Sequence, residues 1–337
     1  MVKKAGNVFI NTTVNDISTF IELAVRLDGY LFRGQPAKYH CLSTSLERLI
    51  GDNLKEQGNV ESAILKQFKA RAHHFIPHPP DLNDNVEWLA LLQHHGGPTR
   101  LIDVTESIFI ATYFAIMSSQ KEDSDACVWG ISEDRINNLF EDEYKERQKN
   151  SFPVPPDLYT IIQREALQEN INGIQNGIGS SKTSVNIAII SPQRVNERMV
   201  AQKAKFIAPF ELRNPFIRNF SACMMAYTKD DIKADWCEFQ DLSNRMNPSI
   251  PWSAIRFRIP KDIFPSMLKL LDKMNINEAT LFPGLDGFAR SLQTLATNSK
   301  NINLPQEKKP RTWKYYEELF VRLDEERSGL SARVRPR

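Results

Sequence analysis

The sequence lacks most of the features that mark secreted, membrane-spanning or strongly cationic proteins. It has four cysteines in 337 residues, without Cys-x-x-Cys spacing, which argues for free thiols in a reducing compartment. No apolar run approaches the length of a bilayer span, and the opening MVKKAGNVFINTTVND has no apolar signal core. The formal net charge is +2, so global charge favours neither nucleic-acid nor membrane binding, although a local basic patch stays open. We therefore expect a cytoplasmic protein with no membrane partner.

The most informative stretch is residues 93–115, QHHGGPTRLIDVTESIFIATYFA. Its Gly-Gly-Pro at 96–98 is typical of a helix end, because glycine tolerates a left-handed turn and proline cannot continue a helix. We expect a short strand over 99–104 and a buried helix over 108–117, which is apolar nearly all round. Polar side chains interrupt these elements and are costly to desolvate, so we expect a site at this corner. They are His94, His95, Arg100, Asp103, Thr105, Glu106 and Ser107.

Helix and strand signals alternate irregularly, which predicts an α+β fold with mixed sheets flanked by helices. The expected strands are 30–32, 99–104, 126–131, 185–190, 254–259 and 279–282. The expected helices are 17–27, 60–75, 108–117, 133–149, 265–274 and 285–295. Strand 254–259 alternates apolar and basic residues, so one of its faces is expected to meet solvent.

A change in composition divides the chain near residue 297. We predict one domain over residues 1–296. Residues 297–337 are predicted to form a linker containing Pro305, an amphipathic helix over 313–323 and a basic tail. The tail is expected to be solvated, with nucleic-acid contact as the alternative.

The chain resembles the FRG-domain family, named for the sequence Phe32-Arg33-Gly34. The resemblance rests on several motifs in the family's order, between about residues 20 and 296. They are LFRGQ at 31–35, STSLER at 43–48, the stretch at 93–115, NERMVAQKAKF at 196–206 and TLFPGLDGFA at 280–289.

The motifs also resemble the signature of ADP-ribosyltransferases, in which arginine, serine or threonine, and glutamate lie on separate strands. LFRG at 31–34 is similar to their arginine strand, Thr105-Glu106-Ser107 to their Ser-Thr-Ser turn, and EATLFP at 278–283 to their glutamate strand. This resemblance implies an ADP-ribosyltransferase-like core with helical insertions and NAD as a substrate. Ile276 departs from the pattern of enzymes that modify protein arginines, many of which carry Glu or Gln two residues before the glutamate.

The resemblance implies a role for each matching residue. Arg33 would bind the pyrophosphate or adjacent ribose of NAD as a catalytic and cofactor-binding residue, since a guanidinium grips phosphate oxygens bidentately. Gly34 would let the ligand approach the backbone, and the hydroxyls of Thr105 and Ser107 would orient the arginine and the glutamate. Glu278 would be catalytic and stabilise the positive charge that develops on the ribose. The four residues of this signature, Arg33, Thr105, Ser107 and Glu278, should then line one cleft.

His94 and His95 are expected at a helix C-terminus, whose dipole favours a protonated ring that could grip a phosphate. Adjacent helical residues point about 100° apart, so we expect His94 to face the ligand and His95 to be a partly buried ring beneath the corner. The six histidines could also hold a metal, but without a supporting motif or clustered cysteines or carboxylates no metal is expected.

Structural alternatives remain for several of these residues. Arg33 could form an ion pair that holds its strand to a neighbour, although the following glycine favours a functional role. Glu278 could be an ordinary acid beside a strand. Arg100 and Asp103 lie on one short strand and are expected to form a buried salt bridge with each other. Residues 197, 198 and 202 could line the pocket, but spaced charges on a helix favour a solvated face. Ser43-Thr44-Ser45 is expected to cap a helix.

The leading functional hypothesis is an NAD-dependent ADP-ribosyltransferase or NAD glycohydrolase, acting as a toxin or antiviral-defence effector. Its acceptor would be a macromolecule, RNA, DNA or protein, and an antitoxin or chaperone could be a partner. The alternative hypothesis is a non-catalytic FRG module that binds a nucleotide, a nucleic acid or a protein.

Overall fold

A mixed sheet organises the chain, in a computed structural model that describes residues 8–39, 41–148, 154–178, 185–193, 196–224 and 252–298. Its seven strands run in the order β1-β7-β4-β2-β3-β6-β5. The β1–β7 pair is parallel and the other pairs are antiparallel. The strands are β1 (Val8–Thr13), β2 (Tyr30–Pro36), β3 (Ile102–Thr105), β4 (Ala126–Ser132), β5 (Ile187–Ile190), β6 (Ala204–Pro209) and β7 (Trp252–Ile259).

Helices account for most of the rest of the described chain, which confirms the α+β class. The first six are α1 (Ile17–Arg26), α2 (Ser45–Ile50), α3 (Gln57–Ala72), α4 (Asn85–His94), α5 (Ile108–Lys121) and α6 (Glu133–Gln148). The next six are α7 (Pro156–Gln175), α8 (Glu197–Ala201), α9 (Phe216–Met224), α10 (Phe264–Lys273), α11 (Glu278–Leu281) and α12 (Leu285–Asn298). Two 3₁₀ turns are η1 (Leu54–Glu56) and η2 (Lys261–Ile263).

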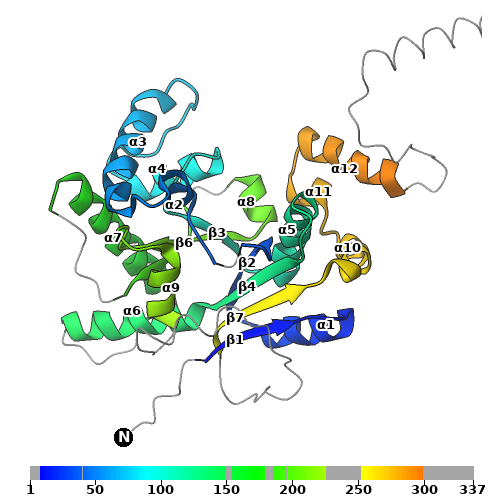
Figure 1. The fold of residues 1–337 in the computed structure, drawn as a ribbon. Coiled ribbons are helices and arrows are strands. Elements are labelled where there is room, and N and C mark those ends of the chain that lie inside the picture. The colour runs from blue at the N-terminus through cyan, green and yellow to red at the C-terminus, as the bar shows by residue number, and fades with distance from the viewer. Residues whose placement is uncertain are drawn as a thin grey trace, which may run out of the picture. The chain divides into compact units, whose positions relative to one another are not determined.

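Helices cover both faces of the central strands, because successive strand residues point to opposite sides. In β4, Cys127 and Trp129 join an apolar cluster with α3, α4, α6, α7 and α9. Ala126 and Val128 join a second cluster with α1, α5 and α10. In Figure 1, α7 and α9 accordingly lie on one side of the sheet and α1 and α10 on the other.

Several elements differ from those expected from the sequence. Residues 279–282 were expected to be a strand, but they belong to α11 and the turn after it, because Asn277 and Thr280 form a capping box that starts a helix. The expected solvent face of 254–259 is also wrong for Arg256, which is 2% exposed. Its Nε donates to Asn11 at 2.8 Å, and its guanidinium lies over the Trp129 ring. Strands β1 and β6 and helices α7 and α9 were not expected.

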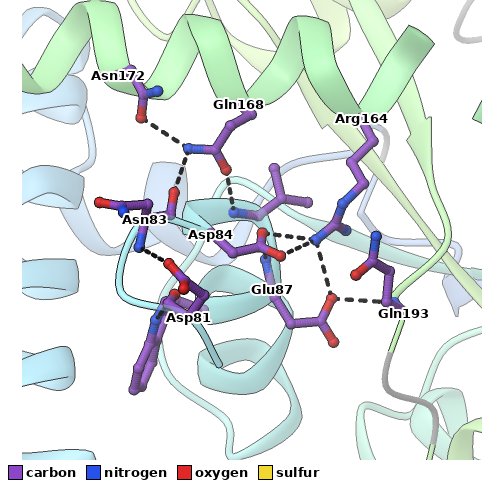
Figure 2. A network of polar contacts seen from close by, with 10 residues as sticks. Asp81, Asn83, Asp84, Glu87, Arg164, Gln168, Asn172 and Gln193 are labelled. Atoms are coloured by element: carbon purple, nitrogen blue, oxygen red, sulfur yellow. Dashed lines mark hydrogen bonds and ion pairs between the residues drawn. The ribbon is translucent and has the colours of Figure 1, made fainter. Parts of the chain in front are cut away.

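A polar network fixes α4 against α7, a helix that the sequence did not indicate (Figure 2). The Asp84 carboxylate caps α4 by accepting from the Glu87 amide at 3.0 Å and also accepts from Arg164 Nη2 at 2.7 Å. Arg164 reaches Glu87 at 3.4 Å, and the backbone of Gln193 donates to the same carboxylate at 3.1 Å. This network sets the position of α4, and therefore of the residues at its carboxyl end.

The chain divides into two compact units, residues 1–290 and 291–337. The predicted helix at 313–323 and the basic tail lie outside the described residues. Among those that are described, no helix is both long and apolar enough to cross a bilayer.

Candidate functional site

A cavity of about 620 Å³ lies where β2 and β3 diverge. The two strands are neighbours in the sheet but pair at a single position, Phe32 opposite Thr105. Residues after Phe32 and before Thr105 line the cavity, together with the carboxyl end of α4, one face of α5, the loop after β2, and α8 with β6. This volume lies within the usual range for small-molecule sites.

The charged groups of the cavity are mostly cationic. Arg33, Arg48 and Arg198 line it, whereas Asp103 is the one acidic side chain among the described lining residues. Burial lowers the pKa of Arg48, and the neighbouring charge of Arg33 lowers it further. Two guanidinium groups that repel each other inside a cavity would both be stabilised by a bound anion.

Asp103 and a glutamine of α4 orient Arg33. Its Nη1 donates to the Asp103 carbonyl at 3.0 Å and to Asp103 Oδ2 at 3.2 Å. Gln93 Nε2 donates to the same Oδ2 at 2.9 Å, and Gln93 Oε1 accepts from the Thr99 hydroxyl at 2.6 Å. In the described part of the chain, Arg33 Nε and Nη2 make no hydrogen bond, and Arg33 is 31% exposed. The arginine is therefore held at one nitrogen and free at the others.

Arg198 brings a second kind of contact to the cavity. Its guanidinium lies over the Phe282 ring at 4.7 Å, an arrangement in which a cation is attracted to the face of the ring. No salt bridge pairs it with a carboxylate within the described residues. Phe282 in turn packs edge-on against Phe114, which also lines the cavity. Arg198 is exposed, as expected for a solvated face of α8. Its side chain nevertheless lines the cavity.

His94 lines the cavity, as the sequence predicts, but not as the expected protonated ring. Burial lowers its pKa, and the neighbouring His95 and Arg198 lower it further. Asn196 Nδ2 lies 3.2 Å from a ring nitrogen, where a neutral ring can accept a hydrogen bond. His95 is exposed rather than partly buried, because it is the residue at which α4 ends.

Gly34 lines the cavity too, yet the structure gives another reason for a glycine there. A Cβ at this position would lie 2.0 Å from the Ala111 carbonyl oxygen and 2.7 Å from the Ala115 amide. The space beside its Cα is therefore filled by the backbone of α5. Close packing of β2 on α5 explains the glycine without a ligand.

The hydroxyls of Thr105 and Ser107, which were expected to orient Arg33 and Glu278, make other contacts in the structure. The Thr105 hydroxyl donates to the Gln202 carbonyl at 2.7 Å and accepts from the Ser107 amide. The Ser107 hydroxyl caps α5 by accepting from the Ile110 amide at 3.3 Å. Thr105 lines the cavity, whereas Ser107 is not among its described lining residues. Both hydroxyls therefore stabilise the β3–α5 corner instead of Arg33 or Glu278.

Glu278 is not among the described residues that line the cavity. It is the first residue of α11, not part of a strand, and its carboxylate accepts from the Tyr113 hydroxyl at 2.8 Å and from Arg290 Nε at 2.7 Å. Burial and this carboxylate both raise the pKa of Tyr113. The predicted cleft therefore contains Arg33 and Thr105 but not Ser107 or Glu278.

The predicted Arg100–Asp103 salt bridge is also wrong. Arg100 is fully buried and binds Glu61 on α3, with Nε 2.9 Å from each carboxylate oxygen. Its Nη1 donates to Asn170 at 2.8 Å. Residues 100 and 103 diverge because β3 begins only at Ile102, so Arg100 precedes the strand and turns into the helical layer.

Two cavity residues were not identified from the sequence, and a third was considered but assigned to a solvated face. Arg48 belongs to the STSLER motif, where Thr44 forms the predicted helix cap with Glu47, and nothing in the motif signals that the arginine turns back to Ser43 beside Arg33. Gln93 stands in the 93–115 stretch, but its position at the end of α4 hides its contact with Asp103. For Arg198, the spacing of charges favoured solvent.

Comparison with known proteins identifies one family. Residues 28–124 match the FRG domain, so the resemblance predicted from the motifs is confirmed over this part of the chain. The match contains β2, α2, α3, α4, β3 and α5, and all of these except α3 contribute to the cavity lining. The contributions of α8 and β6 lie beyond the match. No curated protein and no solved structure matches the chain. Within the described residues, no three metal-binding side chains form a cluster.

Proposed function

We propose that the cavity binds the phosphates of a nucleotide, with NAD as the expected ligand. The observation that carries this proposal is the convergence of Arg33, Arg48 and Arg198 on one cavity opposite a single described carboxylate. Arginine is suited to phosphate because its planar donors match phosphate oxygens. Phe32 and Phe114 add apolar surface to the lining, as in most ligand sites.

The finer proposal is that the protein cleaves NAD and transfers ADP-ribose to a macromolecule, or hydrolyses NAD, as a toxin or defence effector. It is supported by the resemblance of the arginine strand to ADP-ribosyltransferases and by the place of Arg33 in the cavity. Glu278 would have to exchange its contacts with Tyr113 and Arg290 for the ribose. Helix α11 borders the cavity, since Gln202 lines the cavity and its side chain donates to the Leu281 carbonyl of this helix at 2.9 Å.

The contacts of Glu278 favour a second candidate function, a module that binds a nucleotide without cleaving it. A carboxylate that already accepts from a tyrosine and an arginine has its charge neutralised and its orientation fixed. In this case the cavity would serve recognition alone.

Two measurements separate these functions. NAD binding to the purified chain, followed by calorimetry, tests the cavity, and we expect Arg198→Met to weaken binding about tenfold, the effect of losing one charge-assisted contact. The control is Arg213→Met, since Arg213 is exposed and pairs with Glu211. Absence of NAD binding by the wild type would refute the proposal.

Release of nicotinamide then tests cleavage, with Glu278→Gln as the variant. Glutamine keeps the shape and hydrogen-bonding capacity of the side chain but removes its charge. If Glu278 acts on the ribose, release should fall by about two orders of magnitude or more while NAD affinity stays within about twofold. Full release by Glu278→Gln would assign the glutamate a structural role, and wild-type binding without release would support the non-catalytic module.

A further inference from the structure

The acidic side chain of the cavity has unused hydrogen-bonding capacity. Asp103 projects from β3 with 49% of its side chain exposed. Its contacts with Arg33 and Gln93 both involve Oδ2. Over the described residues, Oδ1 accepts no hydrogen bond, so a carboxylate oxygen is left available to a ligand.

The neighbouring Arg33 has unused hydrogen-bond donors. Arg33 uses Nη1 for Asp103, and its Nε and Nη2 make no hydrogen bond to any described residue. The Arg33–Asp103 ion pair therefore presents two available donors, Nε and Nη2, and one available acceptor, Oδ1, to the cavity. A ligand that uses both must present an anion and, close to it, a hydrogen-bond donor such as a hydroxyl, because a second anion would be repelled by Asp103.

We propose that Asp103 binds the ribose hydroxyls of the nucleotide whose phosphate is bound by Arg33. A ribonucleotide fits these neighbouring donor and acceptor groups, because it carries a phosphate and the 2′- and 3′-hydroxyls on one sugar. Hydroxyls donate to a carboxylate more strongly than to a neutral acceptor. This inference rests on the proposed nucleotide site and makes that site specific for ribose.

A purely structural ion pair is the competing explanation of Asp103, and the two make different predictions. A structural pair would stabilise the fold and affect all nucleotides equally. A ribose-binding carboxylate would alter the preference for ribose over a sugar without hydroxyls. The ratio of two affinities measured on one variant separates these effects, since general damage to the site cancels in the ratio.

The test measures the dissociation constants of ADP and 2′,3′-dideoxy-ADP by calorimetry. We expect the wild type to bind ADP at least about tenfold more tightly, the effect of one or two hydrogen bonds to a charged group. In Asp103→Ala the two constants should agree within about twofold. Dideoxy-ADP should bind at least as tightly as to the wild type, because the variant loses a negative charge beside the bound phosphate. Asp262→Asn, which removes an exposed carboxylate outside the cavity, is the control and should keep the wild-type ratio.

Each result bears on the inference. Equal binding of both nucleotides to the wild type, or a wild-type ratio in Asp103→Ala, would overturn it while leaving the nucleotide site intact. No binding of either nucleotide would overturn the nucleotide site itself and the inference with it. Asp103→Asn keeps the side-chain volume and serves if Asp103→Ala does not fold, and its ratio should fall below about threefold, since a neutral amide is the weaker acceptor.

Discussion

Two arginines beside the same strand show how differently one residue type can be used. Arg100 precedes β3 and is 0% exposed, with hydrogen bonds to Glu61, Asn170 and the Pro209 carbonyl from its three nitrogens. Arg33 crosses from β2 to β3 and is 31% exposed, with bonds from one nitrogen to Asp103. The buried arginine is satisfied by the protein, and the cavity arginine is satisfied in part.

This difference gives a physical criterion for a site. Burying a charge is costly unless it is paired and hydrogen-bonded, so a buried arginine needs all its partners from the chain itself. An arginine that faces a cavity can keep donors for a ligand, because water satisfies them in the meantime. By this criterion Arg33 and Arg198 belong to the candidate site and Arg100 belongs to the fold.

The largest effect is expected from Arg100→Met. It would leave the Glu61 carboxylate buried without its cation, and removing one partner of a buried pair costs about 3–5 kcal/mol of unfolding free energy. Chemical denaturation followed by circular dichroism measures this loss. The control is the double variant Arg100→Met with Glu61→Leu, which removes both charges and should recover most of the stability. A loss below about 1 kcal/mol in the single variant would contradict the comparison.

Compared with Arg100→Met, Arg33→Met is expected to lower stability less and to weaken NAD binding more. The Arg33–Asp103 pair is partly exposed, and such pairs contribute about 1 kcal/mol or less. NAD affinity should fall about tenfold or more, since the variant loses charge-assisted bonds to phosphate. Denaturation and calorimetry on the same preparation measure both quantities. If Arg33→Met lost as much stability as Arg100→Met and no affinity, Arg33 would belong to the fold and not to the candidate site.

The sequence predicted the helices and strands at the centre of the fold better than the side-chain contacts between them. Residues 93–121 follow expectation closely because their signals are local: a Gly-Gly-Pro helix end, a short strand and an apolar helix whose cap is Ser107. The partners of Arg100 and Asp103 were wrong because they come from α3 and β2, far away in sequence. Spacing along a strand can place two residues near each other but cannot exclude a stronger distant partner.

The candidate site was predictable to a similar degree. Arg33 and His94 were found because each stands in a motif with a local structural signal, and both line the cavity. Arg48 was missed, and Arg198 was considered but assigned to a solvated face, because their elements also make ordinary helix caps and exposed faces. Only the tertiary fold brings both side chains to the cavity. Glu278 was misplaced in a strand because an apolar run before proline suits either structure, and the capping box at Asn277 decides for helix.

The smallest effect is expected from the pH dependence of stability through His94. Its pKa in the folded chain lies below the ordinary value of 6.5, because burial and two neighbouring groups disfavour the charged ring. The unfolded chain therefore binds more protons at His94 over the interval between the folded pKa and 6.5, so stability is complete above that interval and decreases as the pH falls through it. Melting temperatures of wild type and His94→Gln, measured from pH 7.5 to about pH 5, should converge at low pH as the wild type loses this contribution. His73→Gln is the matched control, since His73 is exposed and outside the cavity, and it should keep the wild-type slope. Parallel curves for wild type and His94→Gln would mean that the ring is as easily protonated in the cavity as in water, and the cavity would then be more open to solvent than its lining indicates.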